Sequence, residues 1–146
     1  MSRHNMGHPD LDELLNAVVS TAQMLLKEQG EFYPIGAMML ADGEIRTVGL
    51  ADEHYPQAHI DLLTETFQKE AAKGKLRAAA TCLDVLTVPP GKDQKQDAIF
   101  CGLEHCLGES LDAFIPYFRT TDGNFQYDEI YAGRRTPQFF TQMPRC

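Results

Sequence analysis

The amino-acid sequence predicts an α+β protein in which two helices pack on one face of a mostly antiparallel sheet. Two stretches, 11–26 and 60–71, place apolar residues every three or four positions, which is typical of amphipathic helices. After Arg77 the apolar period changes to two, which is typical of strands. A chain of 146 residues has the usual length of one domain. We therefore expect the order helix, strand, strand, helix and four strands.

The first helix is expected to begin at Asp10, which can cap a helix. Glu13 lies three positions later, at the spacing of a reciprocal capping box. The apolar stripe ends near Gly30, a residue type that commonly ends helices. We expect residues 1–9 to form a flexible N-terminal segment and residues 10–146 to form the folded domain.

The remaining elements follow from turn signals and from alternating apolar residues. Asp42-Gly43 predicts a tight hairpin turn between two short strands, and Gly74 ends the second helix. Turn-forming residues then separate the segments of a four-stranded meander. The expected strands cover 35–40, 45–50, 78–88, 97–106, 111–119 and 125–132.

The strand 111–119 carries apolar side chains on both faces, which indicates that both faces are covered. One cover is the helical layer, and a second subunit could supply the other. Phe139 and Phe140 stand together near the C-terminus, and we expect them to dock onto their own domain or onto another subunit. These two residues are our candidates for an interface.

The charge of the chain limits its partners. Thirteen Lys and Arg against 21 Asp and Glu give a formal net charge of -8, with the basic residues scattered. This balance argues against binding to nucleic acid or to an anionic membrane. No apolar run approaches the length of a membrane span, and the first residues carry no apolar signal segment. We therefore expect an acidic cytoplasmic protein.

The four cysteines form no C-x-x-C pair. Their spacing fits neither a zinc knuckle nor a thioredoxin motif, so we expect free thiols that pack as small apolar side chains, with a regulatory disulfide as the alternative. The chain also lacks a G-x-S-x-G elbow, a G-x-G-x-x-G fingerprint and a P-loop. We accordingly predict no cofactor and no metal.

Several short motifs resemble a known family. The chain carries Glu31–Pro34 followed by Gly36 and Ala37, then Gly91-Lys92, Asp97-Ala98-Ile99, Leu103–His105 and Pro116-Tyr117. In these motifs it resembles a family of small uncharacterised bacterial proteins over about residues 10 to 140. The resemblance implies the same fold and brings no activity, cofactor or catalytic residue. Where that family prefers an Asp-Gly turn, this chain has Cys106-Leu107-Gly108, so the resemblance implies a looser or two-sided hairpin, although Leu107-Gly108 by itself is compatible with a tight turn.

One group of polar residues could bind a ligand. A hairpin through the loop 89–96 would set Asp84 opposite the segment that holds Glu104 and His105. A carboxylate beside an imidazole can serve as a general base or as a metal ligand with its hydrogen-bonded support. However, Glu104 and His105 point to opposite faces of a strand, so a solvated polar pair is the alternative. Tyr117 joins this group as a possible ligand contact, because aromatic rings commonly line pockets.

A second group lies before the second helix and contains Asp52, Glu53, His54 and His59. The spacing of its histidines does not match a zinc site, so we expect a polar loop that leads into the helix. His4 and His8 belong to the segment that we expect to be flexible. We assign no metal to either pair.

Our leading hypothesis is a non-enzymatic interaction or regulatory domain that forms a homodimer or binds another protein. It depends on the strand with two apolar faces and on the missing catalytic motifs. The alternative is a small-molecule-binding or metal-binding domain, or a small enzyme, that uses Asp84, Glu104 or His105.

Overall fold

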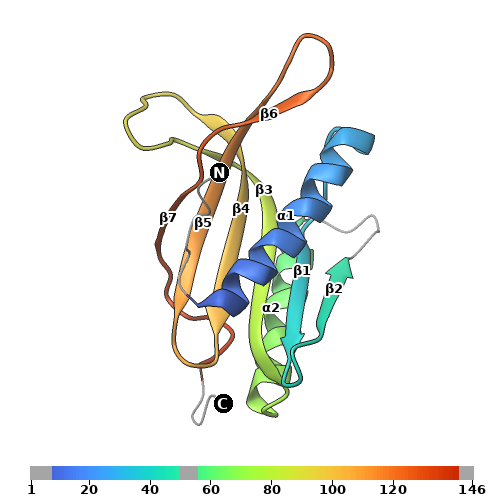
Figure 1. The fold of residues 1–146 in the computed structure, drawn as a ribbon, viewed down its shortest axis with the longest axis vertical. Coiled ribbons are helices and arrows are strands. Elements are labelled where there is room, and N and C mark those ends of the chain that lie inside the picture. The colour runs from blue at the N-terminus through green and yellow to red at the C-terminus, as the bar shows by residue number, and fades with distance from the viewer. Residues whose placement is uncertain (1–7, 50–55, 142–146) are drawn as a thin grey trace.

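A computed structural model describes residues 8–49 and 56–141 and confirms the α+β class. Two helices and an antiparallel sheet of seven strands follow one another in the expected order (Figure 1). Neither helix of this described part is long and apolar enough to cross a membrane.

The first helix, α1 (Pro9–Gln29), begins one residue earlier than we expected. Its N-cap is His8, whose Nδ1 atom accepts a hydrogen bond of 3.1 Å from the backbone N–H of Asp10. Pro9 takes the first helical position, which suits its fixed φ angle. The predicted capping box at Asp10 is therefore wrong, because an imidazole caps the helix instead. His8 and Pro9 belong to the folded domain, and the rest of the segment 1–9 lies outside the described residues.

The first hairpin matches the prediction. Strands β1 (Ile35–Leu40) and β2 (Ile45–Gly49) pair in antiparallel register, and Gly43 in the turn has a φ angle of 92°. Such a positive φ angle favours glycine, so the Asp-Gly signal identified this turn correctly.

The second helix, α2 (Pro56–Ala72), crosses close to β1 at Gly36. A Cβ atom added at this glycine would lie 2.7 Å from the Phe67 ring and 3.0 Å from a Leu63 methyl group. The missing side chain therefore lets the helix approach the strand.

The other strands build the rest of the sheet, in the order β2-β1-β3-β4-β5-β6, with β7 also paired to β5. They are β3 (Leu76–Thr87), β4 (Gln96–His105), β5 (Ser110–Arg119), β6 (Phe125–Tyr127) and β7 (Tyr131–Arg134). The turn between β4 and β5 closes with hydrogen bonds from His105 N–H to Glu109 O (2.8 Å) and from Gly108 N–H to His105 O (3.0 Å). This hairpin is tight rather than loose.

We expected one strand over 125–132, whereas the structure has the two short strands β6 and β7 beside β5. The break lies at Pro116. Its carbonyl accepts a hydrogen bond from the N–H of Asp128 (2.8 Å), but proline has no N–H to return one. The ladder on this side of β5 therefore stops and starts again.

The helices cover opposite faces of the sheet, not one face as we expected. Figure 1 shows α1 in front of the sheet and α2 behind it. Ala78, Ala80 and Cys82 of β3 belong to the core under α1, whereas Ala79 belongs to the core under α2. A continuous run of apolar residues is the pattern of a strand buried on both faces, and Ala78–Ala80 is such a run.

A β-bulge near the start of β3 breaks this alternation. Met39 pairs with Ala78, but its neighbour Leu40 pairs with Leu76, so Arg77 is an extra residue in the ladder. Leu76 therefore joins the core under α2, while the Arg77 guanidinium reaches Asp10 of α1. A bulge commonly redirects one side chain in this way.

Candidate functional site

The start of α1 meets the end of β4 in a group of polar side chains that we call the helix-start cluster. Its members are His8, Asp10, Arg77, His105 and Glu109. Oδ2 of Asp10 lies 2.9 Å from Nε2 of His105 and 2.8 Å from Nη2 of Arg77. The carboxylate of Glu109 accepts a hydrogen bond of 2.6 Å from the backbone N–H of His8. His105 is only 4% exposed, so the centre of the cluster is shielded from water.

Hydrogen bonds assign the tautomer of His105. The backbone N–H of Leu107 donates to Nδ1 at 3.1 Å, so Nδ1 acts as an acceptor and carries no proton. Nε2 therefore carries the proton of the neutral ring and donates it to Asp10. Since both nitrogens are engaged, neither is open to act as a general base on a substrate.

His8, Asp10 and His105 place one ligand atom each within 4.8 Å of one another, and two imidazoles with a carboxylate can bind a transition metal. Their arrangement does not fit such an ion. The two rings are stacked at a centroid distance of 4.0 Å and an angle of 24°, so their in-plane lone pairs do not converge. A metal-bound imidazole also donates its second N–H, whereas Nδ1 of His105 accepts one. We describe the cluster as an anchor for α1.

The helix-start cluster keeps Asp10 ionised. Burial alone would raise the pKa of this carboxyl group, but hydrogen bonds from His105 and Arg77 and the positive charge of Arg77 outweigh it and lower the pKa below its usual value. The carboxylate thus holds together the first turn of α1, the bulge of β3 and the end of β4.

Glu104, on the other face of β4, holds the chain that follows β7. Its carboxylate accepts hydrogen bonds of 2.8 Å from Nε of Arg135 and from the N–H groups of Gln138 and Phe139, and one of 3.3 Å from Phe140 N–H. Nη1 of Arg135 also contacts Asp112 at 2.9 Å. We call this group the tail anchor. Glu104 is 1% exposed, and its charge is compensated by a guanidinium and three backbone donors.

Gly102 makes room for the tail anchor. A Cβ atom at this position would lie 2.5 Å from Nη1 of Arg135 and 2.6 Å from its central carbon. The guanidinium therefore lies directly against the backbone of β4 at Gly102, two residues from Glu104. The same placement carries Phe139 and Phe140 into the core under α2, where Phe139 meets the Phe67 ring edge-on at 5.1 Å.

These contacts decide between our two expectations for Phe139 and Phe140. The rings are 1% and 3% exposed within a single chain. They dock onto their own domain, and they offer no surface that a partner could cover.

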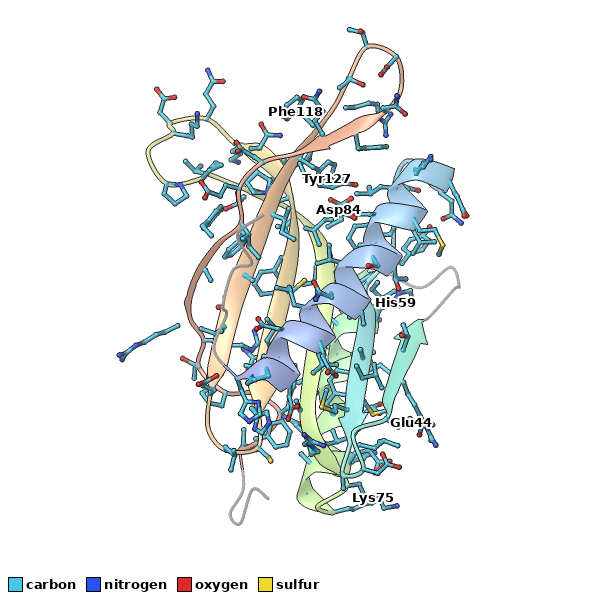
Figure 2. All side chains as sticks on the ribbon, viewed as in Figure 1. Glu44, His59, Lys75, Asp84, Phe118 and Tyr127 are labelled. Carbon is cyan, nitrogen blue, oxygen red and sulfur yellow. The ribbon has the colours of Figure 1, made fainter. Side chains whose placement is uncertain are left out.

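Asp84 and Tyr117 form a third polar site. The Tyr117 hydroxyl donates a hydrogen bond of 2.6 Å to Oδ1 of Asp84. Burial raises the pKa of Asp84, the tyrosine bond partly offsets this, and the charges of Asp97 and Glu31 raise the pKa further. Burial also raises the pKa of Tyr117, and the nearby Asp84 carboxylate adds to that rise. Figure 2 shows Asp84 near the C-terminal end of α1.

The predicted ligand group is therefore distributed over three places. Asp84 is opposite Ile99, whereas His105 is opposite Ala78. The two pairs are six positions apart along β3, which is about 20 Å of extended strand. Glu104 points to the other face, as we predicted, and only Asp84 and Tyr117 of the four residues touch. The gap lined by Glu104 and His105 has essentially no free volume.

The second predicted group cannot be compared as a whole, because Asp52, Glu53, His54 and also His4 lie outside the described residues. His59 is 2% exposed on α2, and the Tyr33 ring lies against it at 5.9 Å. His59 therefore lies in the core on α2, and not in a polar loop before the helix as we expected.

The three cysteines in the described part of the chain divide into two kinds, while Cys146 lies outside it. Cys82 and Cys101 are free and buried, as we expected. Cys106 is disulfide-bonded, so the prediction of a free thiol is wrong at this position.

Two hollows lie away from the predicted ligand group. One of about 470 Å³ lies between β1 and the end of α2, near Lys75 at the opposite end of the sheet from Asp84 (Figure 2). The other, of about 300 Å³, lies between the loop 89–96 and β5 and includes Phe118. Neither is lined by Asp84, Glu104, His105 or Tyr117.

The face behind the sheet carries a row of apolar side chains that lie outside the core cluster under α2, and α2 packs mainly on β1 and β3. The row consists of Leu83, Phe100, Phe114 and Tyr131, which are consecutive partners in register across β3, β4, β5 and β7. We call it the aromatic row. Phe114 lies 5.0 Å from the Tyr131 ring, stacked at 12°, and 5.1 Å from the Phe100 ring. All four side chains are half-buried.

Sequence reasoning missed the partners in both anchors. Asp10 was interpreted as a helix cap, and neither Arg77 nor Arg135 was assigned a partner. One signal was present, since a glycine in the middle of the apolar strand 97–106 indicates a close approach by another group. Here that glycine is Gly102, and the group is Arg135.

Fold and anchors together define an α+β protein with an antiparallel sheet between two helices. The sequence matches no family model and no curated protein, and the structure matches no solved structure. The family resemblance of the short motifs therefore stays a prediction.

Proposed function

We propose that this protein is a non-enzymatic interaction domain that forms a homodimer through the aromatic row. The observation that carries the proposal is the alignment of Leu83, Phe100, Phe114 and Tyr131 across four adjacent strands on a face that α2 leaves uncovered. Adjoining aromatic side chains that remain partly accessible are typical of interfaces.

A second copy of the chain is the partner that this surface suits best. The row carries no charged side chain, so two copies with a net charge of -8 each can meet there without like charges in direct contact. Two-fold dimers pair a surface with itself, and aromatic rings stack well on one another. The binding of His105, Glu104 and Asp84 to other side chains or backbone groups of the chain favours this role over an enzyme or a ligand-binding domain.

The oligomeric state tests the proposal. We expect light scattering to give twice the chain mass of 16.4 kDa at micromolar concentration. Phe114→Lys should give the mass of one chain, because it places a charge at the centre of the contact. Leu86→Lys is the matched control, since Leu86 is 65% exposed and, three residues from Leu83 on the same strand, points to the other face.

Circular dichroism should show that both variants are folded. A wild-type monomer throughout the micromolar range would overturn the proposal. Equal dissociation by Leu86→Lys and Phe114→Lys would also overturn it, because the effect would then not depend on the face.

A further inference from the structure

We propose that Cys82 and Cys101 form an oxidisable cross-strand dithiol at the centre of the sheet, and that α1 controls access to it. The two residues are direct partners on β3 and β4, and their Sγ atoms are 3.8 Å apart. Both are free thiols with 0% exposure. This site is independent of the proposed homodimer, since both sulfurs lie on the face under α1.

The ladder pattern places the pair where a disulfide fits. The N–H of Cys106 donates to the carbonyl of Arg77 at 2.8 Å, so this pair is hydrogen-bonded. Hydrogen-bonded and non-hydrogen-bonded pairs alternate along an antiparallel ladder. Five positions further along, Cys82 and Cys101 therefore form a non-hydrogen-bonded pair, with Cα atoms about 4.5 Å apart. Disulfides span Cα distances of about 4.4 to 6.8 Å.

Oxidation would need only a small movement of the sulfur atoms, from 3.8 Å to a bond of about 2.05 Å. With a small hydroperoxide as the oxidant, one thiolate attacks the peroxide oxygen and becomes a sulfenic acid, releasing the first water or alcohol. The second thiol then displaces water from the sulfenic sulfur and forms the disulfide. The two sulfurs together lose two electrons and two protons, which the peroxide accepts.

The position of α1 explains how such a pair stays reduced. Sγ of Cys82 lies 4.0 Å from the carbonyl oxygen of Val18 on α1, so the helix covers the pair. Burial raises the pKa of the Cys82 thiol well above its usual value, which makes the reactive thiolate scarce. Local opening of α1 would expose the pair to solvent and oxidant together.

Peptide mapping tests the dithiol. We would treat reduced, folded protein with hydrogen peroxide, alkylate the remaining thiols and digest with trypsin. The peptide 78–92 contains Cys82 as its only cysteine, and 96–119 contains both Cys101 and Cys106. We expect the two peptides to be joined through Cys82 and Cys101, with a mass about 2 Da below the sum of the reduced peptides once the alkyl group on Cys106 is added. Cys101→Ser should abolish this link; no link in the wild type, or one that survives in Cys101→Ser, would overturn the proposal.

The rate of linking tests the control by α1. Asp10→Asn weakens the anchor at the start of the helix without touching either sulfur, and we expect it to accelerate linking at least about fivefold. Glu28→Gln is the matched control, because it removes one carboxylate from an exposed position on the same helix. Equal rates in wild type, Asp10→Asn and Glu28→Gln would overturn the control by α1.

Discussion

Glu104 and His105 are neighbours in sequence, yet they serve two different parts of the molecule. Glu104 faces the α2 side of the sheet and binds the tail, whereas His105 faces the α1 side and binds the helix start. The tail anchor is closed: Arg135 has a side chain 8% exposed and Glu104 one of 1%. The helix-start cluster is more open, with Arg77 at 38% and His8 at 32%.

The comparison shows that burial determines how much stability is lost when one partner of a polar contact is removed. Both sites join a carboxylate to an arginine. At the buried pair Glu104 and Arg135 little water can replace a lost partner, so a change there leaves a charge or a donor unsatisfied. At the helix start, water can reach Arg77 and replace part of what is lost. Three predictions follow this order, from the largest expected effect to the smallest.

The largest effect is expected for Glu104→Ala. The change leaves Nε of Arg135 and three backbone N–H groups without their acceptor, while Asp112 still binds the other side of the guanidinium. We expect the free energy of unfolding to fall by about 3–5 kcal/mol, measured by urea denaturation. Glu129→Ala, at an exposed residue, should change it by less than about 0.5 kcal/mol.

A milder variant keeps this prediction testable if Glu104→Ala does not fold. In Glu104→Gln, we expect hydrogen exchange to accelerate relative to wild type at the amides of residues 138–140. The acceleration should be smaller at the strand amides of β1. If the exchange rates changed equally at all amides of the sheet, this would contradict a role of Glu104 that is confined to the tail.

An intermediate effect is expected for Asp10→Asn, which should lower the free energy of unfolding by about 1–3 kcal/mol at neutral pH. Because the pKa of Asp10 is lowered in the folded state, its ionised form stabilises the protein above the unfolded pKa of about 3.9. This contribution is lost as the pH falls through the lower folded pKa. The stability of wild type and variant, measured by urea denaturation from pH 2 to 7, should therefore converge in acid; a constant difference would contradict the ionic contribution.

The smallest effect is expected at Asp84, where the sign is reversed. Its pKa is raised by burial, so its contribution to stability decreases as the pH rises through the folded pKa. Tyr117→Phe removes the hydrogen bond that lowers this pKa, and we expect the pKa to rise further in a carboxyl-carbon NMR titration. Asp10 belongs to the helix-start cluster and should keep its pKa, so it serves as the control. An unchanged pKa of Asp84 in Tyr117→Phe would contradict the prediction.

Much of the fold could be predicted because its signals are local. Helical periodicity, the Asp42-Gly43 turn and alternation in the later strands each depend on a few consecutive residues. The arrangement of the helices depended instead on which side chains of 78–82 face each helix. A run of alanines gives little contrast between two faces, so the second covered face was missed.

The polar sites could be predicted only where both partners lie in one local pattern. The opposite orientation of Glu104 and His105 followed from strand geometry and is confirmed. Their partners are far away in the chain, since Asp10 lies 95 residues from His105. The bulge at Arg77 gave no recognisable sequence pattern, although it turns this side chain toward α1.

The two anchors also determine how tension would pass through the molecule. A pull on the start of α1 reaches β4 through Asp10 and His105, and a pull on the tail reaches the preceding residue, Glu104. The load therefore crosses the end of a single strand and bypasses most of the sheet. Under mechanical force, this short junction would bear the strain until one anchor ruptured, and the hairpins beyond it would remain unloaded until then.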